Sequence, residues 1–479
     1  MVAAFLLDAP LKAQPSLPVQ PALFSAPSSA LEVRGTWLTT TANDAIATPE
    51  RTAQTMRRLR EIGLNTVYVE AWKNGYTQFP SQVLQRTLGV AQRPAAALQD
   101  PGDRPASPRP ARDLLQETLI EAHRNGLFHI AWFEYGFMAA HGSTMNHLRR
   151  LKPEWLSRDI AGHEVAPNGF VWLNPLHPQA RQFLLDLVLE AVARYDLDGI
   201  QFDDRIVWPY VTMGYDDHTR AVYAAEHGGR QPPSNPRDPA WMRWRADKLN
   251  ALAQEFVARI RAARPALMVS LSPAVYPWSY EHYLLEWPLW ARWPQAARWD
   301  EFVPQAYRTS YTAFADIWQQ QAQALRAVGA YRPRELLAGI RINGEGPDSS
   351  WVQLRDSIEL ARREAQGGHV LWFSRGVLDL HAAELTAFYA ASGPAMSPRF
   401  EPGWRRPALV ARAQAEQPVA GLREWTLPAA PPGRYRLVVH DGQQWQYGQD
   451  LDLPAAGTLA LPTSVERVEL LLDRRATGP

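Results

Sequence analysis

Short apolar runs alternate with longer amphipathic stretches from residue 32 to about residue 389. Such alternation is typical of strand–helix units around a parallel sheet, whose strands are buried on both faces and are therefore almost continuously apolar. Eight apolar runs occur, and we expect them to be the strands of one sheet. They cover residues 33–38, 65–70, 127–133, 199–204, 267–271, 301–305, 336–342 and 369–373.

The amphipathic stretches between these runs carry the end signals of helices. Thr48, Pro49 and Glu50 supply an N-cap, a proline at the first helical position and an early acid, and Gly63 follows the last apolar residue, Ile62. We therefore expect a helix between Thr48 and Gly63. Further helices are expected over residues 113–125, 178–194, 241–263, 314–328 and 348–366.

Eight strand–helix units in succession predict an α/β fold, a closed (β/α)₈ TIM barrel. Polar residues within the apolar runs gather at the carboxyl ends of the expected strands, where barrel enzymes build their active sites. They are Glu70, Glu134, Asp203 with Asp204, Ser272, Gln305 with Tyr307, Arg341 and Ser374. A doubly wound open sheet is the competing architecture, but no Gly-x-Gly-x-x-Gly follows the first strand to bind a dinucleotide.

Changes in composition divide the chain into four parts. Residues 1–30, apolar at first and then rich in Pro, Ser and Ala, are expected to be a disordered leader or the remnant of a signal peptide. Residues 31–393 hold the barrel, with a long functional or mobile loop at about 76–112. Residues 394–406 are expected to be a linker. Residues 407–479 are expected to form a β-rich, sandwich-like accessory domain, with strands at 422–427, 434–440, 458–461 and 468–472.

The charge balance and the lengths of the apolar runs exclude some classes of binding partner. Lys and Arg number 50 against 49 Asp and Glu, so the net charge is +1, and no long run of one sign is present to follow a phosphate backbone. We therefore expect no nucleic-acid partner. No apolar run approaches the ~20 residues that span a bilayer, so no integral membrane segment is expected. The leader-like start favours export to the periplasm or beyond, and the oligomeric state stays open.

Tryptophan is abundant, with 19 residues in the chain. Its flat apolar face and single N–H donor suit both core packing and stacking on a sugar ring. We expect most tryptophans in the core and the remainder at a sugar-binding cleft. In the accessory domain Trp445 and Tyr447 stand out as aromatics, and both a sugar-binding role and a packing or spacer role are compatible with them.

The run 199–204 carries the sharpest candidate for chemistry. Side chains alternate along a strand, so if Ile200 and Phe202 face the helices, Gln201 and Asp203 face the barrel mouth. A carboxylate there can stabilise or attack the oxocarbenium-like carbon of a glycosidic transition state. Asp204 is a second candidate at the same position. Both residues could instead cap the next loop or pair with Arg205.

Two glutamates on neighbouring expected strands are candidates for the partner acid. Glu134 lies between aromatic residues, a desolvating setting that keeps a carboxyl protonated near neutral pH, and is our candidate general acid. Glu70 lies at an equivalent depth and could be catalytic or bind sugar. An ion pair with a neighbouring basic side chain is the structural alternative for Glu134.

Amide, guanidinium and aromatic groups around these acids are candidates for substrate binding, because such groups recur where sugar hydroxyls and sugar faces are bound. For each of them a purely structural role is equally compatible with the sequence. The candidates, beside Glu70, are Arg34, Trp37, Trp72, Asn174, Gln305, Tyr307, Arg341 and Trp372.

The sequence suggests neither a metal centre nor a cofactor. The 12 His show no His-Glu-x-x-His or comparable spacing, and the chain has no cysteine to supply a thiolate ligand. No Gly-x-Ser-x-Gly elbow is present to support a serine nucleophile. We therefore expect chemistry carried by carboxylates, without a cofactor.

Several of these segments together resemble one family. Residues 34–40 (RGTWLTT), 72–81 (WKNGYTQFPS), 199–204 (GIQFDD) and 304–307 (PQAY), in this order, are similar to the glycosyl hydrolase-like 10 family, which includes a bacterial glycosidase of denuded peptidoglycan. The resemblance runs from about residue 32 to 389. It implies a (β/α)₈ barrel that hydrolyses bacterial glycan strands, and it transfers a site role to Asp203 and Asp204.

Three functions remain in competition at this point. The first is a glycoside hydrolase of a bacterial polysaccharide, with peptide-free peptidoglycan strands as the expected substrate. The second is a non-catalytic carbohydrate-binding barrel, because the seventh expected strand ends in Arg341 and Asn343 where many barrel hydrolases place a carboxylate. The third is a barrel enzyme that holds a phosphorylated metabolite near Gly344, Gly346 and Gly376.

Overall fold

The structure is a computed structural model of the whole chain. The expected leader (1–30), most of the expected linker (394–406) and the centre of the long loop lie outside the residues that it describes. The described residues are 31–93, 112–393, 395, 411–412, 414–415, 421–427, 433–442, 444–453 and 458–472.

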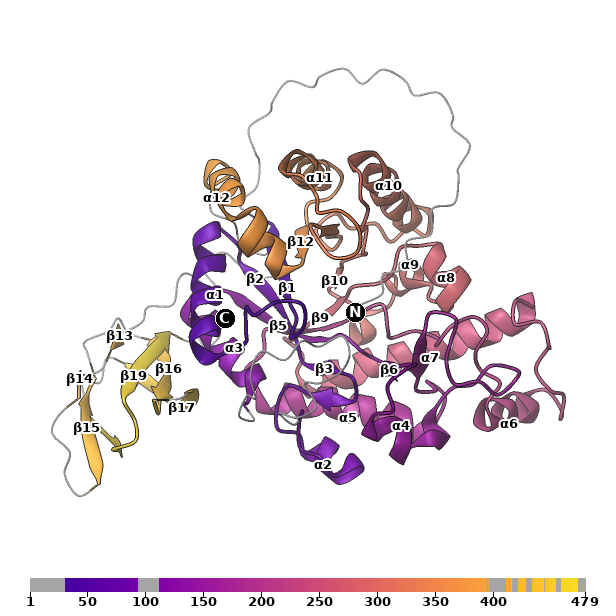
Figure 1. The fold of residues 1–479 in the computed structure, drawn as a ribbon, viewed down its shortest axis with the longest axis horizontal. Helices are drawn as coiled ribbons and strands as arrows, with labels where there is room; N and C mark the ends of the chain where they lie inside the picture. The colour runs from indigo at the N-terminus through magenta and orange to yellow at the C-terminus, as the bar shows by residue number, and fades with distance from the viewer. Residues whose placement is uncertain are drawn as a thin grey trace, which may run out of the picture.

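Eight parallel strands form the central sheet (Figure 1), and their order in space follows their order along the chain. The two edge strands are joined by parallel bridges from Phe302 to Leu336 and from Gln305 to Gly339, which close the sheet into a barrel. The predicted (β/α)₈ TIM barrel is therefore confirmed. The strands are β1 (Val33–Leu38), β2 (Thr66–Glu70), β5 (Phe128–Phe133), β8 (Gly199–Phe202), β9 (Met268–Leu271), β10 (Glu301–Phe302), β11 (Ala338–Arg341) and β12 (Gly368–Trp372).

The expected helices around the barrel all form, with ends within three residues of the predicted ones. In α1 (Pro49–Ile62) the Thr48 side chain accepts a hydrogen bond from the Arg51 N–H, and Gly63 ends the helix at φ 108°, a left-handed conformation that favours glycine. The other helices that cover the strands are α3 (Leu114–Arg124), α5 (Pro178–Arg194), α7 (Pro239–Ala263), α10 (Tyr311–Ala327), α11 (Trp351–Glu364) and α12 (Ala382–Ala391).

Shorter elements decorate the loops of the barrel. Among the described residues, no helix has both the length and the apolar character needed to cross a membrane. The short elements are β3 (Trp72–Lys73), β4 (Tyr76–Thr77), α2 (Gln82–Leu88), β6 (Met138–His141), α4 (His147–Leu151), β7 (Phe170–Trp172), α6 (Asp217–Glu226), α8 (Trp278–Tyr283) and α9 (Trp287–Trp290), with single 3₁₀ or π turns at Pro153–Trp155, Gln295–Ala297 and Gly376–Leu380.

Alternate residues of β8 face opposite sides of the barrel wall. Ile200 and Phe202 belong to the large apolar core between the strands and the helices. Gln201 faces inward, where it accepts a hydrogen bond from the Trp37 indole at 2.7 Å and donates to the Ser270 hydroxyl at 2.9 Å. The predicted alternation is confirmed, and the residue after Phe202 therefore starts at the inner rim of the barrel.

A buried acid lies inside the barrel below this rim. Glu301 is fully buried and accepts a hydrogen bond from the Tyr68 hydroxyl at 2.7 Å. Burial raises the pKa of Glu301 to about 7, although hydrogen bonds with Ser270 and Tyr68 act in the opposite direction.

The C-terminal residues form the predicted strand-rich domain. One antiparallel sheet has the order β13-β19-β16-β17 and the other β14-β15-β18, with a small core that includes Trp425, Tyr435, Leu437 and Leu470. The strands are β13 (Ala411–Arg412), β14 (Gln414–Ala415), β15 (Leu422–Thr426), β16 (Gly433–His440), β17 (Trp445–Leu453), β18 (Thr458–Pro462) and β19 (Arg467–Leu472).

This domain is docked on helix α3 of the barrel (Figure 1). Trp445 is 3% exposed and shares an apolar cluster with Ile120 of α3. The Arg124 guanidinium lies over the Trp445 ring at 4.3 Å and donates to both carboxyl oxygens of Glu469 at 2.7 and 2.9 Å. Tyr447 bonds to His123 at 2.8 Å. Both aromatics that stand out in the sequence of this domain therefore contribute to the interface with the barrel.

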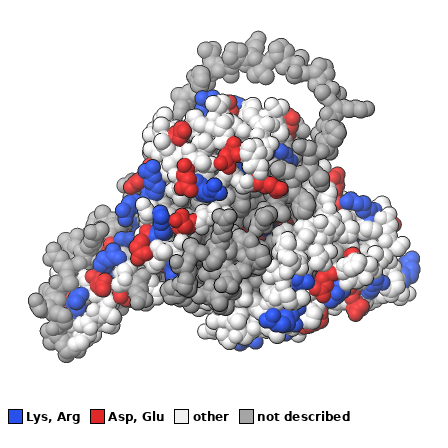
Figure 2. Space-filling model, viewed as in Figure 1, with Lys and Arg blue, Asp and Glu red and all other residues white. Residues whose placement is uncertain are grey.

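Acidic and basic side chains are interspersed on the face of the molecule shown in Figure 2. On the described residues of that face neither sign covers an extended area, in keeping with 50 basic and 49 acidic residues in the chain.

Candidate active site

Asp203 follows the last residue of β8 and lies at the inner rim of the barrel. Its side chain is buried, and one oxygen contacts the Arg205 guanidinium at 2.8 Å. The other oxygen accepts hydrogen bonds from the Asp204 N–H at 2.8 Å and from the Gln305 side-chain amide. The inward position predicted from strand alternation is thus the observed one.

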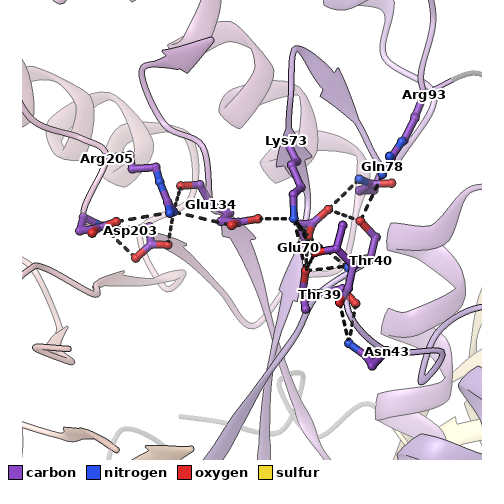
Figure 3. Close-up of polar contacts among 12 residues, drawn as sticks. Thr39, Thr40, Asn43, Glu70, Lys73, Gln78, Arg93, Glu134, Asp203 and Arg205 are labelled. Atoms are coloured by element: carbon purple, nitrogen blue, oxygen red, sulfur yellow. Dashed lines mark hydrogen bonds and ion pairs between the residues drawn. The ribbon is translucent and has the colours of Figure 1, made fainter. Parts of the chain in front are cut away.

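A single nitrogen of Arg205 brings three carboxyl groups together (Figure 3). Nη1 lies 2.8 Å from Asp203, 3.5 Å from Asp204 and 3.7 Å from Glu134. Because Asp203 Oδ2 and Glu134 Oε1 contact the same nitrogen, they are no further apart than the sum of their two distances, 6.5 Å. The acids predicted on two neighbouring strands therefore form one cluster, with Arg205 at its centre.

Gly136 allows the loop after β5 to approach Arg205 closely. It has φ 44°, and a side-chain carbon at this position would lie 2.4 Å from the Arg205 carbonyl oxygen. The Phe137 N–H donates to that same oxygen at 2.9 Å, and Arg205 Nη1 donates to the Glu134 carbonyl at 3.1 Å. Because Gly136 has no side chain, the loop after β5 can approach Arg205 and hold it in place between the acids.

Lys73 extends this cluster towards β2. Its ammonium lies 3.4 Å from Glu134 and 3.3 Å from Glu70, and the lysine side chain is 4% exposed. Glu70 in turn accepts hydrogen bonds from the Thr39 hydroxyl at 2.7 Å, the Thr40 hydroxyl at 2.5 Å and the Gln78 amide at 2.9 Å. Both oxygens of Glu70 are therefore occupied, which fits a residue that holds Lys73 beside Glu134.

The surroundings of the acids separate their pKa values. Burial raises the pKa of Glu134, and the charges of Lys73 and Arg205 oppose this only in part. Burial and the neighbouring charge of Asp204 raise the pKa of Asp203 well above its usual range. For Glu70 burial acts in the same direction, but Lys73 and the threonine hydroxyls outweigh it, so that its pKa is lowered. Glu70 thus remains an anion, whereas Glu134 and Asp203 retain protons more readily.

Aromatic side chains line the barrel mouth next to these acids. Tyr307 and Trp372 stack with ring centres 5.8 Å apart, and Trp37 meets Trp372 edge-on at 5.9 Å. Trp372 is half-buried, at the end of β12, and its peptide bond to Phe373 is cis. Trp37 is 1% exposed, and its N–H is bonded to Gln201. Trp372 is therefore the ring of this group with accessible surface, and Trp37 packs beneath it.

Three of the expected substrate-binding residues form no hydrogen bond or ion pair with the side chains of Asp203, Asp204 or Glu134 in the described residues. Arg34 is near the start of β1, at the opposite end of the barrel, where it pairs with Glu32 at 2.6 Å. Trp72 is fully buried against the ring of Phe183 on α5. Asn174 donates to Asp216, the N-cap of α6, at 2.8 Å. Their contacts are structural, and the structure does not bring them to Asp203.

Four segments that lie far apart in the sequence converge at this rim. The segment 34–40 contributes Thr39 and Thr40, and the segment 72–81 contributes Lys73 and Gln78. The segments 199–204 and 304–307 contribute Asp203, Gln305 and Tyr307. Among the described residues, no group of three His, Asp or Glu side chains is arranged to hold a metal ion.

Comparison with known protein families assigns the barrel to one family. The family model described as "Glycosyl hydrolase-like 10" matches residues 32–348. The chain belongs to this family. The match spans every barrel strand except β12 and includes all residues of the acidic cluster.

Two curated relatives are similar over part of the chain. "Glycosyl hydrolase YngK" of Bacillus subtilis (strain 168) is 30% identical over 166 residues, which are 34% of this chain and 30% of that protein. "Glycosyl hydrolase DigH" of Escherichia coli (strain K12) is 24% identical over 224 residues, 45% of each chain. The chain thus matches less than half the length of either relative.

Solved structures share the barrel fold at low sequence identity. The glycoside hydrolase domain of PgaB (BpsB) from Bordetella bronchiseptica superposes with a TM-score of 0.55 at 13% identity, over 76% of this chain and 99% of that domain. The catalytic domain of β-amylase from Paenibacillus polymyxa gives a TM-score of 0.51 at 11% identity, over 76% and 97%. These likenesses confirm the fold of the barrel.

Proposed function

We propose that this protein hydrolyses glycosidic bonds of a bacterial polysaccharide by carboxylate acid/base catalysis, and that peptide-free peptidoglycan strands are its substrate. The observation that carries the proposal is the cluster of Asp203, Asp204 and Glu134 around one guanidinium, at the rim where barrel enzymes hold their substrates. Membership of a glycosyl hydrolase-like family supports it. An extracytoplasmic location, periplasmic or secreted, belongs to the same proposal.

In the proposed reaction the two buried acids divide the work. Glu134 in its protonated form donates a proton to the glycosidic oxygen as the bond from that oxygen to the anomeric carbon breaks. Asp203 acts in its ionised form, which the Arg205 guanidinium at 2.8 Å favours against the effect of burial, and its carboxylate faces the positive charge that develops on the sugar ring. A water molecule then adds to the anomeric carbon and releases its proton to a carboxylate. Arg205, in contact with both acids, links the ionisation of each to the other.

The test is the variant Asp203→Asn, which keeps the shape of the side chain and removes its charge. We expect product formation from peptide-free peptidoglycan strands, measured by mass spectrometry, to fall by about 10²-fold or more. Circular dichroism should show an unchanged fold. The matched control is Asp217→Asn, an exposed acid on α6 that should leave activity unchanged. Full activity in Asp203→Asn would refute the proposal.

A non-catalytic carbohydrate-binding barrel is the second candidate. It is favoured by the burial of Glu134, which is 0% exposed and ion-paired on both sides. In that case calorimetry should detect binding of the glycan strands to the wild-type chain, while no shorter products form at any pH between 4 and 9. Products that depend on Asp203 would exclude this candidate.

A further inference from the structure

Arg341 differs from the other buried arginines of the described residues in its contacts. The other four are Arg34, Arg149, Arg205 and Arg245. The first three each pair with a carboxylate, at 2.6, 3.3 and 2.8 Å, and the fourth donates to four backbone carbonyls. Arg341 is 5% exposed but has no ion pair within the described residues and donates only to the Glu345 carbonyl, at 2.6 Å. Its Nη1 has no partner there.

An unpaired buried guanidinium is costly, because its charge loses water without gaining a counter-charge. Proteins retain such groups mainly where they serve a ligand, and a guanidinium fork matches the two oxygens of a carboxylate. The contacts of Arg341 therefore indicate an anionic ligand at this position.

Arg341 lies at the same rim as the candidate catalytic acids. It is the last residue of β11 and pairs in register with Trp372 of β12, whose ring stacks on Tyr307. Tyr307 in turn lies close enough to Asp203 and Asp204 for their charges to raise the pKa of its hydroxyl. A ligand held by Arg341 would thus lie beside the half-buried indole that borders the acidic cluster.

Two further donors follow the same pair of strands. Asn343 and Ser374 are 1% and 0% exposed, and neither the Asn343 amide nitrogen nor the Ser374 hydroxyl has a hydrogen-bond partner among the described residues. The oxygen of Asn343 accepts from the Phe373 N–H at 3.4 Å, which turns this side chain towards the end of β12. The carboxyl ends of β11 and β12 therefore hold three unsatisfied donor groups. Burial lowers the pKa of Arg341, and the charges of Asp348 and Glu345 oppose this only in part, because neither acid forms an ion pair with the arginine within the described residues.

The loop over Arg341 offers a route for a ligand. Residues 344–348 are exposed. Gly344 and Gly346 have φ 123° and 82°, and side-chain carbons there would lie 3.3 Å from the Trp372 indole nitrogen and 3.7 Å from Arg341 Nη2. The two glycines thus place no side chain over Trp372 or Arg341, and the Glu345 carbonyl is the group that a ligand oxygen would replace on the arginine.

We propose that Arg341, supported by Asn343 and Ser374, binds a carboxylate carried by a sugar of the substrate next to the cleaved bond. This inference rests on the proposed glycan hydrolysis and narrows the substrate to glycans that contain acidic sugars. Peptide-free peptidoglycan meets this condition, because every second sugar of its strands carries a carboxylate. A neutral glucan or chitin strand does not.

The experiment compares one glycan in two chemical forms. Short peptide-free peptidoglycan oligosaccharides are prepared with their carboxylates intact and with the carboxylates reduced to alcohols, and each is titrated into the full-length Asp203→Asn protein by calorimetry. We expect the intact glycan to bind about 10- to 100-fold more tightly. Asp203→Asn is the parent protein of the second measurement, in which Arg341→Gln is added to it. This double variant should bind the intact and the reduced glycan equally, each as weakly as the parent binds the reduced glycan.

The controls separate the carboxylate site from general effects. Arg363→Gln, at an exposed arginine of α11, should keep the preference for the intact glycan. Arg341→Lys keeps the charge without the fork and should keep only part of the preference. Inorganic phosphate at millimolar concentration should not displace the intact glycan; displacement together with equal binding of both glycans would assign the site to a phosphate instead.

If the Asp203→Asn protein binds the intact and the reduced glycan with equal affinity, the inference is overturned, and no Arg341 variant is needed for that conclusion. A preference that survives Arg341→Gln would overturn it as well. Failure of the proposed hydrolysis is distinguishable, because it would appear as a wild-type chain that forms no products while the titrations still report carboxylate binding.

Discussion

Replacing the buried Glu301 by glutamine should make the stability of the barrel less dependent on pH. Glu301 lies inside the ring of strands, where it accepts a hydrogen bond from Tyr68 and has the Ser270 hydroxyl as a second polar neighbour. Glutamine has nearly the same shape and keeps an acceptor for the Tyr68 hydroxyl. The change therefore removes an ionisable group from the interior and leaves the packing around it intact.

The size of the change in stability follows from the raised pKa of Glu301, which is about 7 against an ordinary value of 4.5. Below pH 4.5 the carboxyl is protonated in both the folded and the unfolded chain, and its burial costs nothing extra. Between pH 4.5 and 7 the unfolded chain releases the proton and the folded chain keeps it, so stability falls as the pH rises. Above pH 7 the loss is complete, roughly 3 kcal/mol at about 1.4 kcal/mol for each pH unit.

Urea unfolding followed by tryptophan fluorescence at pH 4.5 and pH 8 measures this effect. Relative to wild type, the free energy of unfolding of Glu301→Gln should be larger at pH 8 than at pH 4.5 by up to about 3 kcal/mol. Glu335→Gln, at an acid before β11 that pairs with Arg298, should not show this upward trend. A difference between Glu301→Gln and wild type that is the same at both pH values would refute the reasoning.

Three further changes test the site and the docked domain. Gly136→Ala should destabilise the barrel by about 2 kcal/mol more than Gly162→Ala, whose left-handed position faces open space, when both are compared by thermal unfolding. Lys73→Met should raise the pKa of Glu134 and move the alkaline loss of hydrolysis to higher pH, whereas Lys73→Arg should not. Trp445→Ala should lower stability by about 3 kcal/mol in urea unfolding while hydrolysis persists, because the indole packs at α3 and not at the rim.

The fold was predictable because each strand and helix carries its own local signals. Thr48 and Gly63 mark the ends of α1, and the inward position of Asp203 follows from the two-residue period of β8. The distance along a strand could have excluded Arg34, since it precedes Trp37 by three residues and thus lies about 10 Å further from the carboxyl rim.

The missing members of the site depend on contacts that strand periodicity does not encode. Lys73 lies in a short hairpin after β2, where the chain reverses and no period assigns a face. Arg205 reaches Glu134 because Gly136 admits its backbone, a contact between two loops. The signal that could have found Lys73 and Gln78 is their place inside the segment 72–81, which resembles the family as a whole and not only through its aromatic residues.

The shared contact at Arg205 means that Asp203 and Glu134 have no independent titrations. Removing a proton from one of them changes the field felt by the other through the same nitrogen, so a pH profile reports the protonation of the pair and not of a named residue. The loss of activity in the double variant of Asp203 and Glu134, expressed as a free energy, should then be smaller than the sum of the losses in the two single variants. A complete double-mutant cycle measures how much of the loss comes from the coupling between the two residues.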